Sequence, residues 1–171
     1  YAEDNEIIMT ESGIPIKVKL GKDWEYLFGI KFKKNTELLS YPYGKRFKRG
    51  TIKKTTKLPN GMKIKSGTKI CFLPNGELKK VTLAADWESR KGRTMLSGTD
   101  VVWFDNGFFR MITLAKEMLS TAGPVLKKKS VVLCYPDGKY KLIQIANKYE
   151  NLHPGTIIYF DESGNAIINP D

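Results

Sequence analysis

The sequence contains very little of what enzymes and metal sites are built from. His153 is the only histidine, and Cys71 and Cys134 are the only cysteines. A zinc site on the two thiolates would lack ligands, and a serine or cysteine triad would have to use His153 as its base. His153 stands where related segments carry Leu96 or Lys65, which does not favour a specialised base. We therefore expect no catalytic residue, no metal and no cofactor.

Long hydrophobic runs and targeting signals are also missing. No apolar run reaches the roughly 18 residues that a membrane helix needs, and no glycine cluster matches a phosphate-binding loop. Segment 1–4, YAED, is polar and acidic, so we expect any targeting segment to have been removed. Hydrophobic residues make up 41% of the chain, which favours a folded domain. We predict a single repeat domain over residues 1–171, and two cysteines do not fix its redox compartment.

Negative charge is scarce in the middle of the chain. Residues 17–93 hold 21 of the 29 Lys and Arg against six Asp and Glu, a net charge of +15. Residues 1–16 carry four acids and no base, and residues 94–171 carry eight of each. This asymmetry indicates either an anionic partner or a lysine-rich surface that only confers solubility.

What the sequence has in abundance is repetition. The octet GMKIKSGT at 61–68 is matched by GIKFKKNT at 29–36 and GRTMLSGT at 92–99, and more weakly by GPVLKKKS at 123–130 and YENLHPGT at 149–156. A turn glycine recurs at intervals of 31, 32, 31, 31 and 26 residues, at Gly13, Gly44, Gly76, Gly107, Gly138 and Gly164. Intervals kept this closely indicate six tandem copies, the last one truncated.

Each copy has the pattern of a β-hairpin. Segment 68–84, TKICFLPNGELKKVTLA, places β-rich runs on both sides of Asn-Gly, which favours a tight hairpin turn. Two adjacent apolar columns run through the first strand, and two more run through the second. The columns are Ile7, Leu38, Ile70, Val101, Val132 and Ile158; Ile8, Leu39, Cys71, Val102, Leu133 and Tyr159; Val18, Val81, Ile112 and Ile143; and Leu20, Ile52, Leu83, Leu114 and Ile145. Since adjacent strand residues point to opposite faces, the first strand should be covered at least partly on both sides.

The sequence thus predicts an all-β fold of about six tandem hairpin repeats of about 31 residues. We expect the hairpins to stack as an elongated solenoid-like or rolled antiparallel sheet, and a closed barrel is the alternative. Each octet would supply a third, shorter extended piece that joins successive hairpins.

Basic residues alternate with apolar ones in two of the octets. In a strand, the lysines flanking Phe32 and Ile64 would share a face, and the repeat would stack them as a ladder of positive charge. The run KRFKR at 45–49 holds four more basic residues, of which Lys45 and Arg46 are taken as candidates. The candidate anion-binding residues are Lys31, Lys33, Lys63, Lys65, Lys45 and Arg46. Such a surface suits phosphates of nucleic acid, lipid headgroups or an acidic glycan, and no recognition helix indicates base readout.

A second candidate site is the tripeptide Asp-Trp-Glu, which occurs twice, two repeat lengths apart. Its residues are Asp23, Trp24, Glu25, Asp86, Trp87 and Glu88. Each copy follows the second hairpin strand, so we predict two equivalent loops. An indole between carboxylates suits a sugar ring, and glycosidases use carboxylate pairs. Alternatively the Asp caps a turn and the Trp packs over the neighbouring copy, which the matching segment EML at 117–119 favours.

The clearest copies are SGTKICFLPNGELKKVTLAAD at 66–86 and SGTDVVWFDNGFFRMITLAKE at 97–117. They resemble hairpin-repeat segments in exported proteins of Gram-negative bacteria that have no assigned chemistry, and more distantly MORN-type repeats, which are shorter. Asn35 and Lys129 depart from the pattern by replacing the glycine of Gly-Thr. The resemblance implies a periplasmic, outer-membrane-associated or secreted location and a binding or structural role.

Three functions stay open at this point. The first is a non-enzymatic scaffold or binding module of the cell envelope, whose basic surface meets an anionic surface or polymer, or another envelope protein. The second is a carbohydrate-binding or carbohydrate-active protein that uses the two Asp-Trp-Glu segments. The third is non-specific nucleic-acid binding. The sequence does not indicate an oligomeric state.

Overall fold

The computed structural model describes residues 5–41, 46–119, 125–148 and 152–167. These residues form an all-β fold whose principal antiparallel sheet has twelve strands, as the sequence predicts. The helical content of the described residues is one 3-10 turn, η1 (Leu27–Gly29). The chain divides into an N-terminal unit, Tyr1–Ala84, and a C-terminal unit, Ala85–Asp171. Each unit contributes six strands to the principal sheet.

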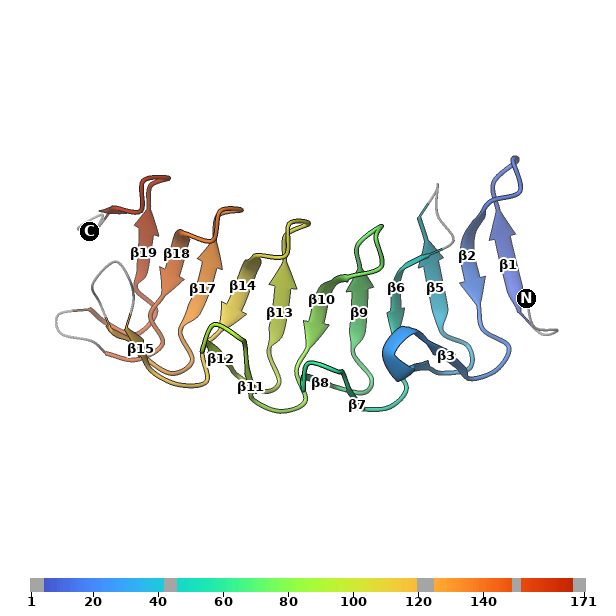
Figure 1. The fold of residues 1–171 in the computed structure, drawn as a ribbon, viewed down its shortest axis with the longest axis horizontal. Coiled ribbons are helices and arrows are strands. Elements are labelled where there is room, and N and C mark those ends of the chain that lie inside the picture. Colours follow the sequence, from blue (N-terminus) through green and yellow to red (C-terminus); the bar gives the residue numbers. More distant parts are fainter. Residues whose placement is uncertain (1–4, 42–45, 120–124, 149–151, 168–171) are drawn as a thin grey trace. The chain divides into compact units, whose positions relative to one another are not determined.

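The sheet of the N-terminal unit is made of three hairpins in sequence order (Figure 1). Its strands are β1 (Glu6–Met9), β2 (Pro15–Lys19), β5 (Glu37–Ser40), β6 (Phe47–Thr51), β9 (Lys69–Phe72) and β10 (Leu78–Thr82). Every neighbouring pair in this order is antiparallel. Each hairpin also has a register shift near its turn, which is the mark of a β-bulge.

The C-terminal unit repeats the arrangement. Its strands in the principal sheet are β13 (Asp100–Trp103), β14 (Phe109–Thr113), β17 (Val131–Cys134), β18 (Tyr140–Gln144), β19 (Ile157–Phe160) and β20 (Ala166–Ile167). They pair antiparallel in that order. Segment 108–119 is mostly strand, through β14 and the strand at 118–119.

A second, smaller hairpin follows the main hairpins, and the sequence interpretation missed it. In the N-terminal unit, β3 (Trp24–Tyr26) pairs with β4 (Ile30–Phe32), and β7 (Thr56–Lys57) pairs with β8 (Lys63–Ile64). In the C-terminal unit, β11 (Trp87–Glu88) pairs with β12 (Thr94–Met95), and β15 (Met118–Leu119) pairs with β16 (Val125–Leu126). The octet strands are thus halves of two-stranded sheets. The Asp-Trp-Glu segments enter strands, so the prediction of loops was wrong.

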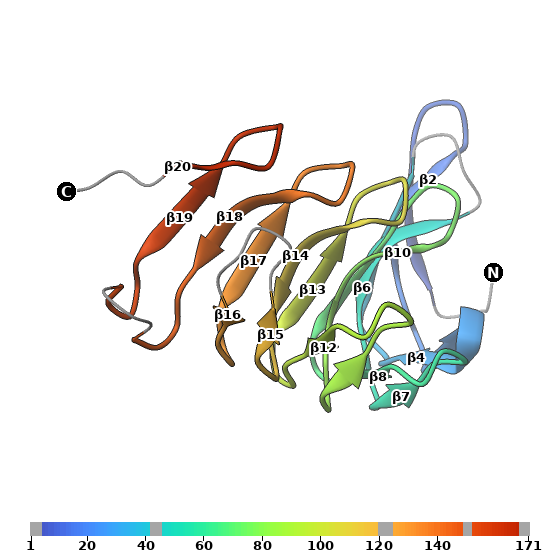
Figure 2. The same ribbon diagram turned by 60° about the vertical axis from the view of Figure 1, so that its left-hand side comes forward.

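The small hairpins are tied to the ends of the main strands. In the N-terminal unit, isolated bridges join Phe32 to Ile52 and Ile64 to Leu83. Each octet strand therefore pairs with the exit of the main hairpin that follows it in sequence. Figure 2 shows β4, β7 and β8 beside the lower part of the main strands, away from the main-hairpin turns. This position lets the small hairpins cover one face of the sheet.

The turns explain the spacing of the glycines. In the third main hairpin the Leu73 N–H donates to Glu77 O at 2.7 Å, and the Gly76 N–H donates to Leu73 O at 2.9 Å. Gly76 has φ +88°, a left-handed conformation that favours glycine. Asn35 (φ 64°) and Lys129 (φ 72°) adopt the same region where other copies carry the glycine of Gly-Thr. Of the predicted turn glycines, Gly44 lies outside the described residues.

The core lies between the main strands and the small hairpins. Three of the predicted columns point into it, and all of their described members are buried except Ile7, which is half-buried. Small-hairpin residues such as Phe32 and Ile64 are fully buried with them. Gly50 lies beneath this layer, because a Cβ there would come within 2.4 Å of Leu38 and 2.7 Å of Phe32.

The opposite face of the main strands is open. The column that begins with Ile8 and ends with Tyr159 was expected to be at least partly covered. Ile8 is 55% exposed, Tyr159 is 46% exposed, and the members between them are half-buried. The cover of this column is thus only partial, because the small hairpins pack on the inner face. Among the described residues no second layer packs against this column, so packing does not restrict its side chains.

Candidate anion-binding site

The open face of the N-terminal unit presents basic side chains in two rows across the strands. The strand registers place one row at Lys17, Leu39, Arg49, Cys71 and Lys80. They align Glu6, Lys19 and Glu37 in a second row and pair Thr51 with Lys69, so this part of the face carries two lysines and two glutamates. Because strands lie about 4.8 Å apart, these rows bring residues distant in sequence close together. The face is therefore basic through its fold as well as its composition.

A hollow of about 570 Å³ opens on this face. It is lined by strands β2, β5, β6 and β9 and by the turn that enters β5. The lining residues are Lys17, Lys33, Lys34, Asn35, Thr36, Glu37, Leu39, Arg49, Gly50, Thr51 and Lys69. Five of them are basic and one is acidic, and the lining includes no aromatic ring. The hollow therefore attracts anions and offers no surface for stacking a base or a sugar.

Part of this charge is neutralised within the unit. Lys17 forms an ion pair with Glu37, and the Lys19 Nζ lies 2.9 Å from Glu6 Oε1. Within the ranges that the structure describes, Lys33, Lys34, Arg49 and Lys69 form no ion pair. Four cations thus face the hollow without a protein counterion among those residues.

The structure separates the lysines that the sequence grouped as a ladder. Strand β4 ends at Phe32, so Lys31 belongs to the small hairpin while Lys33 lies beyond it. Lys31 Nζ is 3.0 Å from Glu25 Oε2 across β3 and β4, whereas Lys33 lines the hollow. The two lysines thus lie in different segments, and the stacking of equivalent lysines from one octet to the next stays a prediction.

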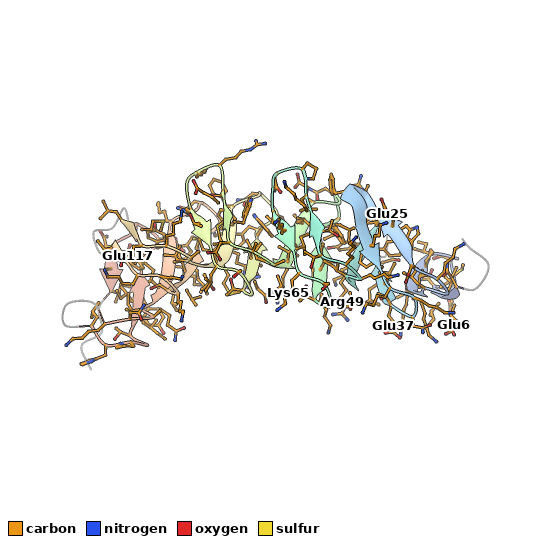
Figure 3. The ribbon with its side chains drawn as sticks, turned by 90° about the horizontal axis from the view of Figure 1, so that it is seen from below. Glu6, Glu25, Glu37, Arg49, Lys65 and Glu117 are labelled. Carbon is orange, nitrogen blue, oxygen red and sulfur yellow. The ribbon has the colours of Figure 1, made fainter. Side chains whose placement is uncertain are left out.

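The second octet shows the same division. Lys63 is exposed in β8, and Lys65 follows the end of that strand. Figure 3 places Lys65 with Arg49 and Glu37 on one side of the ribbon and Glu25 on the other. Of the remaining pair, Lys45 lies outside the described residues. Arg46 is exposed and reaches over the next turn, where a Cβ on Gly76 would meet its Nη1 at 2.6 Å.

The residues that sequence reasoning missed are Lys17, Lys34, Arg49 and Lys69. Their signal was period-two alternation: Lys17 and Lys19 flank the buried Val18, and Arg49 and Thr51 flank Gly50. The sequence shows this alternation. Which of the two faces is exposed becomes known only once the small hairpins are known to cover the other one.

The Asp-Trp-Glu segments have structural contacts in both units. The Lys34 N–H donates to Asp23 Oδ1 at 2.7 Å, and the Ser97 N–H donates to Asp86 Oδ1 at 2.7 Å. Each carboxylate thus holds the turn that follows the paired octet strand.

The two tryptophans are half-buried. The Trp24 ring lies among the rings of Tyr26, Phe32 and Phe47, with centroid distances of 5.1, 6.2 and 5.4 Å. Trp87 stands opposite Met95 in the small hairpin. Half-burial leaves part of each indole accessible, so sugar binding through Asp23, Trp24, Glu25, Asp86, Trp87 and Glu88 stays a prediction.

Neither cysteine is in a disulfide. Burial raises the pKa of the Cys134 thiol, and the nearby Arg93 offsets this only in part. A raised thiol pKa disfavours the reactive thiolate at neutral pH. The described residues contain no cluster of three His, Cys, Asp or Glu side chains suited to a metal.

In the C-terminal unit, the equivalent open-face row is apolar. The registers align Val102, Met111, Leu133, Leu142, Tyr159 and Ile167 across its six strands. The N-terminal unit carries 18 Lys and Arg against 8 Asp and Glu, a net charge of +10, while the C-terminal unit carries 11 against 10, a net charge of +1. Nearly all of the net positive charge of the chain thus lies in the N-terminal unit.

The fold and the basic face define an all-β protein built of antiparallel hairpins, with a candidate anion site in its N-terminal unit. No family model matches the chain, and no curated protein matches it. None of the helical segments in the described part of the chain is long and apolar enough to cross a membrane.

Proposed function

We propose that the chain is a non-enzymatic repeat protein of the cell envelope or the secreted space that binds an anionic partner through its N-terminal unit. The observation that carries this proposal is the hollow on the open face, with five basic side chains and one acidic side chain. Four of these cations have no counterion among the described residues, so binding an external anion costs no existing ion pair.

The repeat architecture supports a role as a scaffold or binding module. Stacked hairpins expose a broad regular face, and solenoid-type proteins use such faces to bind extended partners. The buried Cys134 thiol has a raised pKa, which disfavours its use as a nucleophile. The location outside the cytoplasm comes from the resemblance to exported hairpin-repeat segments.

The test is salt-dependent binding to anionic probes. The chain is applied to immobilised heparin and to phosphatidylglycerol vesicles, with phosphatidylcholine vesicles as the uncharged control. We expect retention at low ionic strength that is lost as salt rises, since screening weakens contacts between exposed charges. Retention that does not change between low and high salt, or equal binding to both vesicles, would contradict the proposal.

A further inference from the structure

We propose that the hollow in the N-terminal unit is an oxyanion subsite, which binds two neighbouring phosphate or sulfate groups carried by one ligand. This inference rests on the proposed function and specifies the chemistry of the anionic partner at one site. Arg49 is the central contact, and Lys33, Lys34 and Lys69 complete the site.

The side chains of the hollow match the chemistry of phosphate and sulfate. The planar guanidinium of Arg49 offers two parallel N–H donors to an oxyanion, whereas lysines act as point charges. The side-chain amide of Asn35 and the hydroxyl of Thr51 also line the hollow, and neither bonds to any residue that the structure describes. Charged and neutral donors are therefore available together.

The arrangement of the cations favours two anionic groups. Lys33 and Lys34 lie in the turn that enters β5, while Arg49 and Lys69 come from the adjacent strands β6 and β9. The register aligns Thr51 with Lys69, so Lys69 is one step diagonal from Arg49. The cations thus form two pairs, one from the turn and one from the strands. Lys17 remains engaged with Glu37 at the border of the hollow.

Size and lining argue for the charged groups of the ligand as the part recognised. At about 570 Å³ the hollow has the volume of an ordinary small-molecule site, which exceeds the needs of a single phosphate. Its lining includes no aromatic ring and one aliphatic side chain, Leu39. Recognition of a base or of an apolar sugar face is not supported there, and duplex nucleic acid becomes an outcome of the test.

The first experiment uses the full chain and inorganic tripolyphosphate in titration calorimetry, with orthophosphate as the single-group comparison. We expect one tripolyphosphate per chain and roughly tenfold tighter binding than orthophosphate, because a second charge-assisted contact is added. Equal affinity for the two anions would overturn the assignment of two groups.

Three variants locate the binding. Arg49→Lys keeps the charge and loses the bidentate fork, and we expect a loss of roughly tenfold. Arg49→Gln/Lys69→Gln removes two charges from the hollow and should lose more than Arg49→Lys. Lys54→Gln/Lys57→Gln removes two charges from exposed lysines just before and within β7 in the same unit, and we expect a change below about twofold. Arg49 is exposed, so thermal melts should show each variant folded.

The outcomes separate this inference from the proposed function. Equal losses in the two double variants mean that only the overall charge matters, which overturns the subsite. Salt-dependent heparin retention that Arg49→Gln/Lys69→Gln leaves unchanged also overturns it while the proposed function stands. Tripolyphosphate binding that depends on Arg49, in a chain that binds neither heparin nor anionic vesicles, supports the subsite and contradicts the proposed function.

Competition identifies the source of the oxyanions. Tripolyphosphate should displace heparin fragments if a sulfated glycan enters the hollow, and should displace phosphatidylglycerol vesicles if the phosphates of two neighbouring headgroups of the vesicle do. Displacement of either probe supports the inference. Displacement of duplex DNA alone would reassign the face to nucleic-acid backbone binding and overturn it.

Discussion

Two residues at the Gly-Thr position of the repeat occupy a backbone conformation that suits glycine. Asn35 and Lys129 have φ of 64° and 72° at the position that Gly67 and Gly98 fill in other copies. The backbone hydrogen bonds of the turn are kept, since the Lys129 N–H donates to Leu114 O at 2.7 Å. The turn therefore keeps the same backbone conformation even where the residue has a Cβ that disfavours positive φ.

Lys129→Gly should stabilise the C-terminal unit by up to about 1 kcal/mol, because a left-handed lysine carries a Cβ clash that glycine avoids. Asn35→Gly should gain less, since asparagine tolerates this region. Urea denaturation of the two variants beside the parent chain measures the difference. A Lys129→Gly variant that is less stable than the parent would show that the side chain itself is needed.

Gly50 is required for a different reason, which is space. A Cβ there would lie 2.4 Å from Leu38 Cδ2 and 2.7 Å from Phe32 Cε1. Gly50→Ala should therefore destabilise the chain by about 1–3 kcal/mol through overpacking. In a Leu38→Ala background the same change should cost less, because the nearer of the two clashing side chains is truncated. Denaturation of all four proteins tests this, and additive effects would contradict the steric cause.

Asp161 is expected to show a pH dependence. Its Oδ1 accepts the backbone N–H of Asn165 at 2.8 Å, and this bond is the largest cause of a pKa below the ordinary aspartate value. A lowered folded-state pKa means that the carboxylate contributes stability above its unfolded pKa and loses it as pH falls through the folded value. An NMR titration should place the Asp161 midpoint below that of unfolded aspartate. A midpoint at or above it would exclude the bond in solution.

At the scale of elements, the small hairpin depends on a carboxylate that was read as a candidate for sugar binding. Asp86 Oδ1 accepts the Ser97 N–H at 2.7 Å, and Asp23 holds Lys34 in the same way. Asp86→Ala should cost about 1 kcal/mol of stability, while Glu88→Ala, on the same exposed strand end, should stay within about 0.5 kcal/mol. Thermal denaturation distinguishes the two. Equal stability with equal loss of glycan binding would instead support the sugar site.

The main hairpins could be predicted from the sequence, and the small ones could not. Gly76 and its equivalents, together with buried columns such as Ile70 and Val81, fixed the main strands and their inner face. The first strand of a small hairpin reads Trp-Glu-Tyr, Thr-Lys, Trp-Glu or Met-Leu in successive copies, so Trp-Glu recurs in two of them and no pattern runs through all four. Only the octet half recurs in every copy, so its partner was taken for a loop.

The candidate site was predicted only in part for the same reason. Lys33 was identified from its octet, but Arg49 and Lys69 meet it through strand pairing across β5, β6 and β9. Such neighbours are set by register and by which face is covered. A single-sequence pattern gives the alternation of faces and leaves open which face remains exposed.

For the whole molecule, the uneven charge predicts an effect of salt on stability. The N-terminal unit has a net charge of +10, and self-repulsion of that size is relieved by screening. The urea midpoint should rise with sodium chloride, and sodium sulfate at equal ionic strength should raise it further if an oxyanion binds the native state. Because sulfate also strengthens burial generally, Arg49→Gln/Lys69→Gln is the control. A midpoint that falls with chloride would contradict the repulsion.

The open face of the sheet has a consequence for how such a chain can change over generations. Turn glycines and the inner columns maintain the fold. Every second residue of a main strand points outward, and the fold does not restrict its identity. Duplicating or deleting one 31-residue copy does not change the alternation of inner and outer positions in the other copies, so their inner residues stay on the inner face. New binding specificities can therefore arise through point substitutions at the outward positions alone. The basic row from Lys17 to Lys80 and the apolar row from Val102 to Ile167 are two different sets of outward side chains on the same kind of hairpin backbone.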